Sequence, residues 1–523
     1  MNTVMNKKML VESDLHETRI AILEQDRLAE LFIERRERLG IVGNIYLGRV
    51  SRVLPGMQAA FVNIGLDRDA FLYVDEVSDR LATYGDLEEE ADEETDEEPD
   101  EEPAIGGAAA DPAPEGEPAA PANHRSIDQL LQAGQEITVQ VLKDALPNKG
   151  ARVSTQITLP GRSLVLLPNV THLGVSRRIE DEEERQALRE ILEELQPPGT
   201  GLIVRTAGAA ASREEFESDL AYLTRLWERI QHRRERLAAP TLLHRDLDLA
   251  LRVVRDHLSA DYSVILVDGE ETYERIVDFV DQVQPSLLGR VKLFQQDAAL
   301  FERFAVDAEI EAALKTKVWL KSGGHIVIHP TEALVAIDVN TGRYVGRHNL
   351  EDTVLTTNLE AVEEIVRQIR LRNLGGIIVI DLIDMVDPTH RQQVSEALAE
   401  EMAKDGARHR VLNISEFGLV EITRKRSRPS LERLLAQPCP YCHGIGRIKS
   451  LTTIGLELRR QLLRQRERFR DHEILLRVHP DVAQALQRVE QPILRELERE
   501  IHAEILVQSD PGLHHERFDI LEV

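Results

Sequence analysis

One stretch of the sequence has a composition that no compact domain can bury, so the fold must leave it in a loop. Between Asp86 and Glu117 there are 16 Asp or Glu residues and no Lys or Arg, and Pro, Ala and Gly make up most of the rest. Such a segment offers too little apolar surface to offset the entropy lost on ordering. We therefore expect a disordered acidic insert over about residues 86–123. Acidic runs are usually only solvated, although one could also mimic RNA and compete for a nucleic-acid groove.

The insert accounts for much of the acidity of the whole chain. The formal net charge of the 523 residues is −28, and it shrinks to −12 without the 16 charges of the insert. Because the chain also carries 64 Lys and Arg, its global charge does not exclude a nucleic-acid partner. The length and the 42% apolar content predict three or four globular domains.

The sequence carries no pattern for export or membrane insertion. No apolar run approaches the ~18–20 residues of a membrane span, and the amino-terminal residues lack the apolar core of a signal peptide. Two cysteines exclude a disulfide framework. We expect a cytoplasmic protein.

Short strand patterns flank the insert on both sides. Five of them are expected at 44–54, 59–64, 70–74, 136–142 and 151–157. Five short strands with a long loop between the third and the fourth predict a small barrel of the OB type. Phe61, Phe71 and Lys149 would suit single-stranded nucleic acid there, because aromatic rings stack on bases beside a cation for the phosphate. A Phe on a strand is nevertheless more often a core residue.

The rest of the chain alternates strands and helices. We expect strands at 163–167, 202–206, 263–267, 325–329, 333–337 and 376–380, and helices at 181–195, 212–238 and 358–371. A final region of about 75 residues mixes Arg-rich helix with short strands.

Two of these strands end in carboxylates. Asp338 ends one apolar strand and shares a strand face with Asn340, and Asp381 ends the next one. If the strands are neighbours, the two carboxylates converge and repel each other unless a proton or a cation intervenes. Oxygen ligands without a nearby His or Cys favour Mg²⁺ or Mn²⁺ over zinc. The alternative is that each Asp only caps the next helix or turn.

Two basic features are weaker signals. Arg205 followed by Thr206 ends a strand with a guanidinium and a hydroxyl, a pair suited to a phosphate. The run 424–428 holds four Lys or Arg and is expected to be a solvated patch that could track a phosphate backbone.

Both cysteines lie in Cys439-Pro440-Tyr441-Cys442. A redox CxxC should open a helix, but Gly444 and Gly446 follow here and oppose one. A CxxC followed by glycines favours a zinc knuckle; a redox pair and idle thiols are the alternatives.

Eight motifs taken together resemble a known family. In chain order they are GNIYLGRV, AAFVNIG, NKGARVST, GRSLVLLPN, GLIVRTAG, ALVAIDVNTG, TNLEAVEEIVRQIRLRNLGGIIVIDLIDM and CPYCHGIGR. They resemble the ribonuclease E/G family of bacterial endoribonucleases from about residue 9 to the carboxy terminus. The length resembles the ribonuclease G-like branch, which has no long disordered scaffold.

The resemblance implies an α/β multidomain fold. It comprises an RNase H-like domain interrupted by an S1 (OB) barrel and a 5′-sensor region, a DNase I-like catalytic α/β domain, a zinc link and a small carboxy-terminal α/β domain. The expected bounds are 1–39 and 249–313 for the two RNase H-like parts, 40–160 for the barrel, 161–248 for the sensor, 314–435 for the catalytic domain, 436–447 for the zinc link and 448–523 for the small domain.

The resemblance also implies roles for individual residues. Asp338 and Asp381 would bind Mg²⁺, and Asn340 would position the attacking water or a carboxylate. The 5′-monophosphate sensor would comprise Gly161, Val165, Arg205, Thr206 and Arg408. The RNA-binding face of the barrel would comprise Phe61, Phe71 and Lys149. Ile64 stands where some members carry a tyrosine, which would weaken one stacking surface.

Zinc bound by Cys439 and Cys442 would need two more ligands, since structural sites have four. The simplest completion is a second chain whose CPYC gives Cys₄ around one shared ion, and hence a two-fold homodimer. The family resemblance implies the same sharing and possibly a homotetramer. An in-chain Cys₂His₂ site with distant histidines is the alternative.

We therefore expect a Mg²⁺-dependent endoribonuclease. By resemblance it would cut single-stranded, AU-rich RNA with a 5′-monophosphate preference, leave 5′-phosphate and 3′-hydroxyl ends, and act in rRNA processing and mRNA decay. No convincing His pair supports a metal-free mechanism driven by the 2′-hydroxyl. The rival is a non-catalytic S1-type RNA-binding or ribosome-assembly protein, and a thiol oxidoreductase rests on CPYC alone.

Overall fold

The computed structural model describes residues 7–523 except 36–39, 78–125, 146–148, 180, 210, 297, 343–349, 416, 427, 470–471 and 489–490. The predicted acidic insert, residues 86–123, lies wholly outside the described residues. The chain divides into two compact units, residues 1–434 and 435–523, which are described separately. No helix among the described residues has the length and apolar content needed to cross a membrane.

The first sheet of the larger unit joins the amino terminus to a much later segment. Its five strands run in the order β15-β14-β1-β2-β3, and β1 pairs in parallel with β14. Their bounds are β1 (Lys7–Ser13), β2 (Glu17–Glu24), β3 (Arg27–Arg35), β14 (Tyr262–Asp268) and β15 (Val291–Leu293). Helices nearby are α5 (Leu249–His257), α6 (Glu270–Val283), α7 (Leu300–Arg303), α8 (Val306–Ala313) and the 3₁₀ turn η5 (Pro285–Arg290). Everything between β3 and α5 is therefore an excursion from one domain.

The first part of that excursion is a closed five-stranded barrel, as predicted. β4 pairs with both β5 and β7, which closes the ring β4-β5-β6-β8-β7. The elements are β4 (Ile45–Leu54), η2 (Pro55–Met57), β5 (Ala59–Asn63), β6 (Ala70–Tyr73), η3 (Val74–Glu76), α2 (Ile127–Leu130), β7 (Glu136–Lys143) and β8 (Arg152–Ser154). The insert falls between the third and fourth strands in sequence, where a barrel tolerates a long loop.

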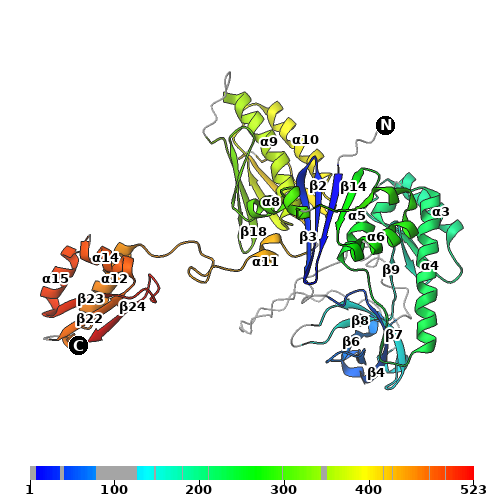
Figure 1. The fold of residues 1–523 in the computed structure, drawn as a ribbon, viewed down its shortest axis with the longest axis horizontal. Coiled ribbons are helices and arrows are strands. Elements are labelled where there is room, and N and C mark those ends of the chain that lie inside the picture. Colours follow the sequence, from blue (N-terminus) through cyan, green and yellow to red (C-terminus); the bar gives the residue numbers. More distant parts are fainter. Residues whose placement is uncertain are drawn as a thin grey trace, which may run out of the picture. The chain divides into compact units, whose positions relative to one another are not determined.

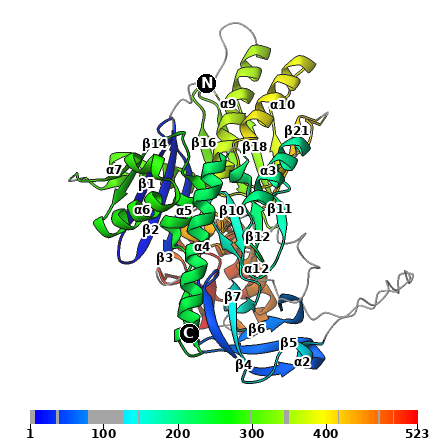
Figure 2. The same ribbon diagram turned by 90° about the vertical axis from the view of Figure 1, so that its right-hand side faces the viewer.

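A four-stranded sheet of order β11-β12-β10-β9 follows the barrel. Its elements are β9 (Leu159–Pro160), β10 (Leu164–Leu167), β11 (Leu173–Val175), α3 (Glu182–Leu195), β12 (Gly201–Val204), η4 (Thr206–Gly208) and α4 (Arg213–Arg236). Ser212 and Glu215 form a capping box that begins α4. In Figure 2, α4 runs from β10 toward the barrel, where its end meets β13 (Thr241–His244), the strand that pairs with β4.

The last sheet of the larger unit is mixed and has six strands. Its order is β16-β17-β18-β19-β21-β20. The elements are β16 (Lys317–Trp319), β17 (His325–Pro330), β18 (Leu334–Asn340), α9 (Leu350–Leu371), β19 (Gly376–Asp381), α10 (Pro388–Met402), β20 (His409–Val411), β21 (Leu419–Arg424) and α11 (Leu431–Leu435). α9 and α10 lie along this sheet (Figure 1), and the side chains facing them, such as Ile328, Ile337 and Ile380, are buried.

α9 begins eight residues before the predicted start at residue 358, which corrects that prediction. Two polar residues of this helix, Thr357 and Asn358, find hydrogen-bond partners within the structure. Thr357 Oγ1 donates to the Thr353 carbonyl at 2.8 Å. Asn358, which is fully buried, donates to the Ile383 carbonyl at 2.9 Å and accepts from Ile383 N at 3.1 Å. Asn358 thereby fixes the loop that leaves β19.

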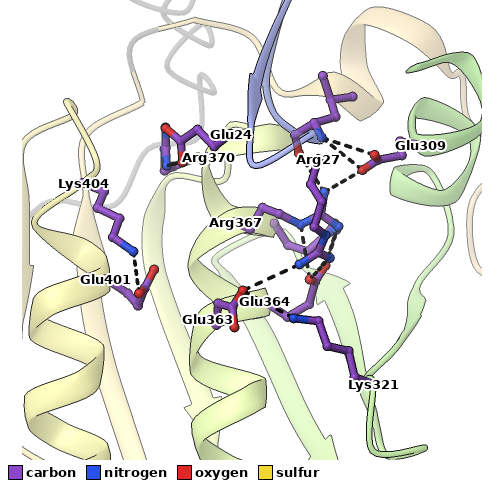
Figure 3. A network of polar contacts seen from close by, with 12 residues as sticks. Glu24, Arg27, Glu309, Lys321, Glu363, Glu364, Arg367, Arg370, Glu401 and Lys404 are labelled. Carbon is purple, nitrogen blue, oxygen red and sulfur yellow. Dashed lines mark hydrogen bonds and ion pairs between the residues drawn. The ribbon is translucent and has the colours of Figure 1, made fainter. Parts of the chain in front are cut away.

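An ion-pair network joins α9 to the first sheet (Figure 3). Arg370 donates to Glu24 Oε1 and Glu30 Oε1, both at 2.8 Å, and Arg367 contacts Glu364 at 2.6 Å and Glu309 at 2.8 Å. Burial would raise the pKa of Glu30, but the neighbouring His257, Arg370 and Arg428 lower it to about 2. The network holds the six-stranded sheet and the amino-terminal strands in one unit.

The smaller unit is a three-stranded sheet with helices. Its order is β23-β22-β24, and β22 and β23 are parallel. The elements are α12 (Leu451–Arg464), α13 (Arg466–Phe469), β22 (Glu473–Val478), α14 (Pro480–Arg488), α15 (Gln491–Ile501), β23 (Glu504–Ser509) and β24 (Phe518–Glu522). Its core gathers apolar side chains such as Leu458, Ile474 and Leu476.

Candidate functional site

Asp338 and Asp381 lie opposite one another on neighbouring strands. β18 and β19 are parallel, and their register pairs Asp338 directly with Asp381. Residues paired in this way share one face of a sheet, with backbones about 5 Å apart. Both side chains are exposed, and Asn340 Nδ2 donates to Asp338 Oδ2 at 2.6 Å. The structure thus brings together the three residues predicted to be catalytic; their roles stay a prediction.

The carboxylate pair has the properties that a hard divalent cation requires. The ion pairs described for the six-stranded sheet and α9 involve neither Asp338 nor Asp381. Two adjacent carboxylates are stable together only when a proton or a cation offsets their repulsion. Oxygen donors without sulfur suit Mg²⁺. The residues present therefore fit Mg²⁺.

Arg205 is held rigidly at the end of β12. Its Nη1 donates to the Gly161 carbonyl at 2.6 Å and to Asp256 Oδ1 at 2.7 Å. Arg255 also contacts the Asp256 carboxylate, at 2.9 Å. Burial opposes ionisation of Asp256, but these two guanidinium groups lower its pKa. Two guanidinium groups thus share the Asp256 carboxylate.

Asp219 positions the loop that contains Gly161, a role that no local pattern indicated. Its buried carboxylate accepts from the backbone N–H groups of Arg162, Ser163 and Leu164 at 2.8–3.2 Å. Burial raises the pKa of Asp219, against the effect of these donors. A methyl group at position 161 would overlap this carboxylate, so the loop requires glycine there.

The basic run 424–428 was predicted to be a solvated patch. The structure corrects this prediction, because Arg424 and Arg428 make contacts within the fold. Arg424 is buried and pairs with Asp405 at 2.6 and 3.0 Å. Arg428 lies over the ring of Phe32, 3.6 Å from its centroid. Tertiary contacts that no local pattern reveals hold Arg424 and Arg428, whereas Lys425 is exposed. The Arg424–Asp405 pair also fixes the loop that carries Arg408.

A cleft of about 2020 Å³ connects most of the predicted sensor residues. Val165, Arg205, Thr206 and Arg408 line it, and Gly161 adjoins it through Pro160. The Thr206 hydroxyl lies 3.0 Å from that of Ser176. The cleft extends to Arg152 on the barrel. The structure thus gathers the residues predicted to bind a 5′-phosphate, and that binding stays a prediction.

The barrel presents an aromatic cluster on its surface. Phe61 pairs with Phe71 across β5 and β6, with ring centroids 5.2 Å apart. The sequence reasoning missed two members, Tyr73, whose ring lies 4.6 Å from Phe71, and Arg152, 5.1 Å above Tyr73. Tyr73 lies two residues after Phe71 in β6, so strand alternation could have indicated that the two rings share a face.

The two other residues of the barrel prediction have different positions. Lys149 is exposed near the start of β8. Ile64 is only 2% exposed and belongs to the barrel core. The absence of a tyrosine at position 64 therefore changes the interior of the barrel, and the exposed aromatic cluster is unaffected.

The CPYC segment has a turn suited to binding metal. The backbone N–H groups of Cys442 and Tyr441 donate to the exposed Cys439 sulfur and lower its thiol pKa. Gly446 N donates to Cys442 Sγ at 3.2 Å, and the positive φ values of Gly444 and Gly446 permit this turn. Among the described residues, no group of three close His, Cys, Asp or Glu ligand atoms includes either cysteine. The thiols fit zinc, and further ligands would have to come from elsewhere.

Tyr441 attaches this turn to the small domain. Its hydroxyl contacts His515 Nδ1, and its carbonyl lies 2.7 Å from His514 Nε2. His515 Nε2 in turn lies 2.7 Å from Asp481 Oδ2. The CPYC turn is therefore part of the small domain's folded surface.

Comparison with known proteins agrees with this geometry. The model of the ribonuclease E/G family matches residues 158–427, and that of the RNase E/G thioredoxin-like domain matches residues 438–523. Ribonuclease G of Escherichia coli (strain K12) is 41% identical over 517 residues, which cover 99% of this chain and 100% of that protein. Ribonuclease G of Haemophilus influenzae is 38% identical over 515 residues, 98% of this chain and 99% of that protein.

Ribonuclease E of Escherichia coli (strain K12) is also similar. It is 36% identical over 458 residues, which cover 87% of this chain and 40% of that protein. The small domain is accordingly thioredoxin-like. A family model that covers half of the chain and full-length relatives at 38–41% identity lead to one conclusion: the chain belongs to the ribonuclease E/G family.

Proposed function

We propose that the protein is a Mg²⁺-dependent endoribonuclease that cuts single-stranded RNA and leaves 5′-phosphate and 3′-hydroxyl ends. The observation that carries the proposal is the direct pairing of Asp338 with Asp381 on an exposed sheet face, with Asn340 bonded to Asp338. The name of the full-length relatives, ribonuclease G, describes an enzyme that cleaves RNA and so supports the proposal. AU-rich rRNA precursors and mRNAs with a 5′-monophosphate are the substrates that the resemblance favours.

The chemistry follows from the charges at this pair. Asp338 and Asp381 would hold Mg²⁺, which supplies positive charge to stabilise the scissile phosphate as its charge grows. Asn340 keeps the Asp338 carboxylate in one orientation through the 2.6 Å bond from its Nδ2. Its amide oxygen can accept a hydrogen bond from the attacking water. Because both strands are fixed in the sheet, the carboxylates need little reorganisation on binding.

The pocket around Arg205 would bind the 5′-monophosphate. Arg205 is pre-oriented by Asp256 and by the Gly161 carbonyl, so a phosphate entering the cleft meets an ordered guanidinium. Phe61, Phe71 and Lys149 would hold the RNA strand on the barrel, where Tyr73 and Arg152 enlarge the aromatic and cationic surface.

We also assign the finer fold on this basis. The β1–β14 pairing supports an RNase H-like domain split by the barrel and the sensor region. The six-stranded sheet with α9 and α10 is assigned as the DNase I-like catalytic domain. These assignments place the sensor, the barrel and the catalytic sheet in a single compact unit, residues 1–434.

One assay tests the activity. The purified chain is incubated with a 5′-monophosphorylated, AU-rich RNA oligonucleotide, with and without Mg²⁺, and the product ends are identified by mass spectrometry. We expect Mg²⁺-dependent internal cuts with 5′-phosphate and 3′-hydroxyl ends. Tight binding without cleavage in Mg²⁺ would instead support the non-catalytic RNA-binding alternative.

Zinc is proposed for the CPYC turn, shared between two chains. The chain offers only two thiolates, and a structural zinc needs four ligands. We expect one zinc per two chains by metal analysis, a homodimer in solution, and dissociation in Cys439→Ser measured by light scattering. His443→Ala serves as the control that keeps both thiolates. One zinc per chain, or a Cys439→Ser protein that stays dimeric at low concentration, would contradict the sharing.

A further inference from the structure

The carboxylate pair lies on a sheet face that also carries an unassigned aromatic and cationic group. The register aligns Lys317 with Val327, Val327 with Asp338, and Asp338 with Asp381 across four strands. A second row aligns Trp319 with His325 and His325 with Asn340. Because paired residues and residues two apart share a face, all these side chains project from the same side of the sheet.

This face is exposed, in contrast to the other. Trp319 is 65% exposed, and Lys317, Asp338 and Asp381 are also exposed. The intervening side chains Ile326, Ile337 and Val339 point the other way and are buried against α9 and α10. Among the described residues, the large Trp319 ring is thus left mostly in solvent on the face that carries Asp338 and Asp381.

Trp319 and Lys317 are arranged as a stacking surface beside a cation. Lys317 Nζ lies 4.2 Å from the centroid of the Trp319 ring, and the His325 ring lies 5.3 Å from it. Single-stranded nucleic acid is held by such pairs, because any base can stack on the ring while the cation neutralises a phosphate. Lys317 is two strands away from Asp338, about 10 Å, so a nucleotide on Trp319 would adjoin the scissile phosphate.

His325 links the two halves of the site. Its Nδ1 is buried and has no hydrogen-bond partner among the described residues. The His325 imidazole lies on the same sheet face as Trp319 and Asn340 and can exchange a hydrogen bond with a base or a ribose hydroxyl.

We propose that Trp319, Lys317 and His325 form a nucleotide-binding subsite adjacent to Asp338 and Asp381, in which a base of single-stranded RNA stacks on Trp319 and Lys317 contacts a neighbouring phosphate. The subsite rests on the proposed endoribonuclease function and extends it. The subsite binds RNA next to the site of cleavage, independently of the 5′ end and of the barrel.

Fluorescence gives a direct test, because the chain has only two tryptophans. Trp227 is packed against the core from α4, so a Trp227→Phe variant leaves Trp319 as the sole indole emitter. The variant is titrated with a 5′-hydroxyl RNA oligonucleotide without Mg²⁺, so that neither cleavage nor the 5′-phosphate contributes. We expect saturable quenching of Trp319. Binding detected by anisotropy of labelled RNA with unchanged Trp319 emission would overturn the proposal.

Kinetics on the same 5′-hydroxyl RNA in Mg²⁺ provide the second test. We expect Trp319→Ala to raise KM about 10- to 100-fold with a smaller change in kcat, Trp319→Phe to recover most of the loss, and Lys317→Ala to raise KM about 3- to 10-fold. Lys321→Ala, which removes another exposed lysine near the same turn, should match the wild type.

The outcomes separate this proposal from the proposed function. If the wild type does not cut RNA, the proposed function fails. If the wild type cuts, Asp338→Asn does not, and Trp319→Ala cuts with the wild-type KM, only the subsite fails. A Trp319→Ala protein with unchanged KM but altered oligomeric state would show that a second copy of the chain covers this face, which also overturns the subsite.

Discussion

The carboxylate pair and the pocket of Arg205 differ in how their charges are balanced. Arg205 is 12% exposed by its side chain and already paired with Asp256 and a backbone carbonyl. Asp338 and Asp381 are exposed, and their charges are left for a partner from solution. Under the proposed assignment, the phosphate pocket is completed by groups of the chain itself, whereas the carboxylate face would be completed by a cation and the substrate. Mutations in the two regions should therefore differ in kind.

The largest effect is expected at the open face. Asp338→Asn or Asp381→Asn removes one of two charges that hold the cation, so cleavage should fall by at least about 10³-fold. RNA affinity should stay nearly unchanged because neither residue belongs to the barrel or the sensor. Single-turnover cleavage and filter binding measure the two quantities. Near wild-type cleavage by either variant would show that the reactive site lies elsewhere.

Like Arg205, Arg370 is paired with carboxylates of the chain itself. Arg370→Met removes the guanidinium that bonds both Glu24 and Glu30 and leaves only longer contacts to Lys7 and Arg428, each at 3.7 Å, which should cost about 3–5 kcal/mol of unfolding free energy. Denaturant unfolding of the variant against the wild type measures the loss. Lys404→Met, which breaks an exposed pair with Glu401 at 2.5 Å, is the control and should change stability by less than about 1 kcal/mol.

The same network predicts a pH dependence. The pKa of Glu30 is about 2 in the folded protein and about 4.3 in an unfolded chain. Its stabilising contribution is therefore complete above about pH 4.5 and is lost as the pH falls toward 2. Wild-type melting temperature should fall over this range, and that of Arg370→Met should fall less or rise. Parallel curves for the two proteins would contradict the assignment.

A smaller effect is expected at Arg205. Arg205→Met should cost about 1.5–3 kcal/mol, about 10- to 100-fold in kcat/KM, on a 5′-monophosphate substrate. The same variant should match the wild type on 5′-hydroxyl RNA. Equal slowing on both substrates would mean that Arg205 supports the fold and does not sense the 5′ end.

The smallest effect is expected from the acidic insert. Deleting residues 88–117 should change the melting temperature by no more than about 2 °C, because the free energy of closing a loop depends only weakly on its length. RNA affinity at low and high salt shows whether the insert also competes for the barrel. A large drop in melting temperature would show that the segment is structural.

Local patterns predicted the elements well where the alternation of apolar and polar residues along one strand determines which side chains are buried. The barrel strands and the strands that end in Asp338 and Asp381 follow from period-2 alternation, and the parallel register then places these carboxylates side by side. Local patterns failed where contacts with residues far away in the sequence determine burial or role. Arg424 reads as solvated, but Asp405 neutralises it in the interior. Asp219 reads as an ordinary helix residue, although it organises a loop about 55 positions earlier.

The start of α9 was predicted wrongly and the exposed face that carries Trp319 was not predicted, for related reasons. Thr353, Thr356 and Thr357 lower helix propensity locally, and the first turns of the helix are supported by contacts that a local pattern does not show, such as the burial of Val354 in the core. Trp319 on a three-residue edge strand shows no alternation long enough to reveal which face it occupies. That face becomes visible only from pairing across three further strands.

The parallel pairing of β1 with β14 has a consequence for the protein during its synthesis. The ribosome makes β1 first, and the strand that covers its free edge emerges roughly 250 residues later, about 12–50 s at ordinary elongation speeds. In that interval β2 can pair with one side of β1, while the other side exposes backbone flanking Met9, Leu10 and Val11, which are fully buried in the finished sheet. An open apolar edge invites intermolecular association. Until β14 is made, the nascent chain is therefore more open to intermolecular association than the finished sheet, in which β14 covers this edge.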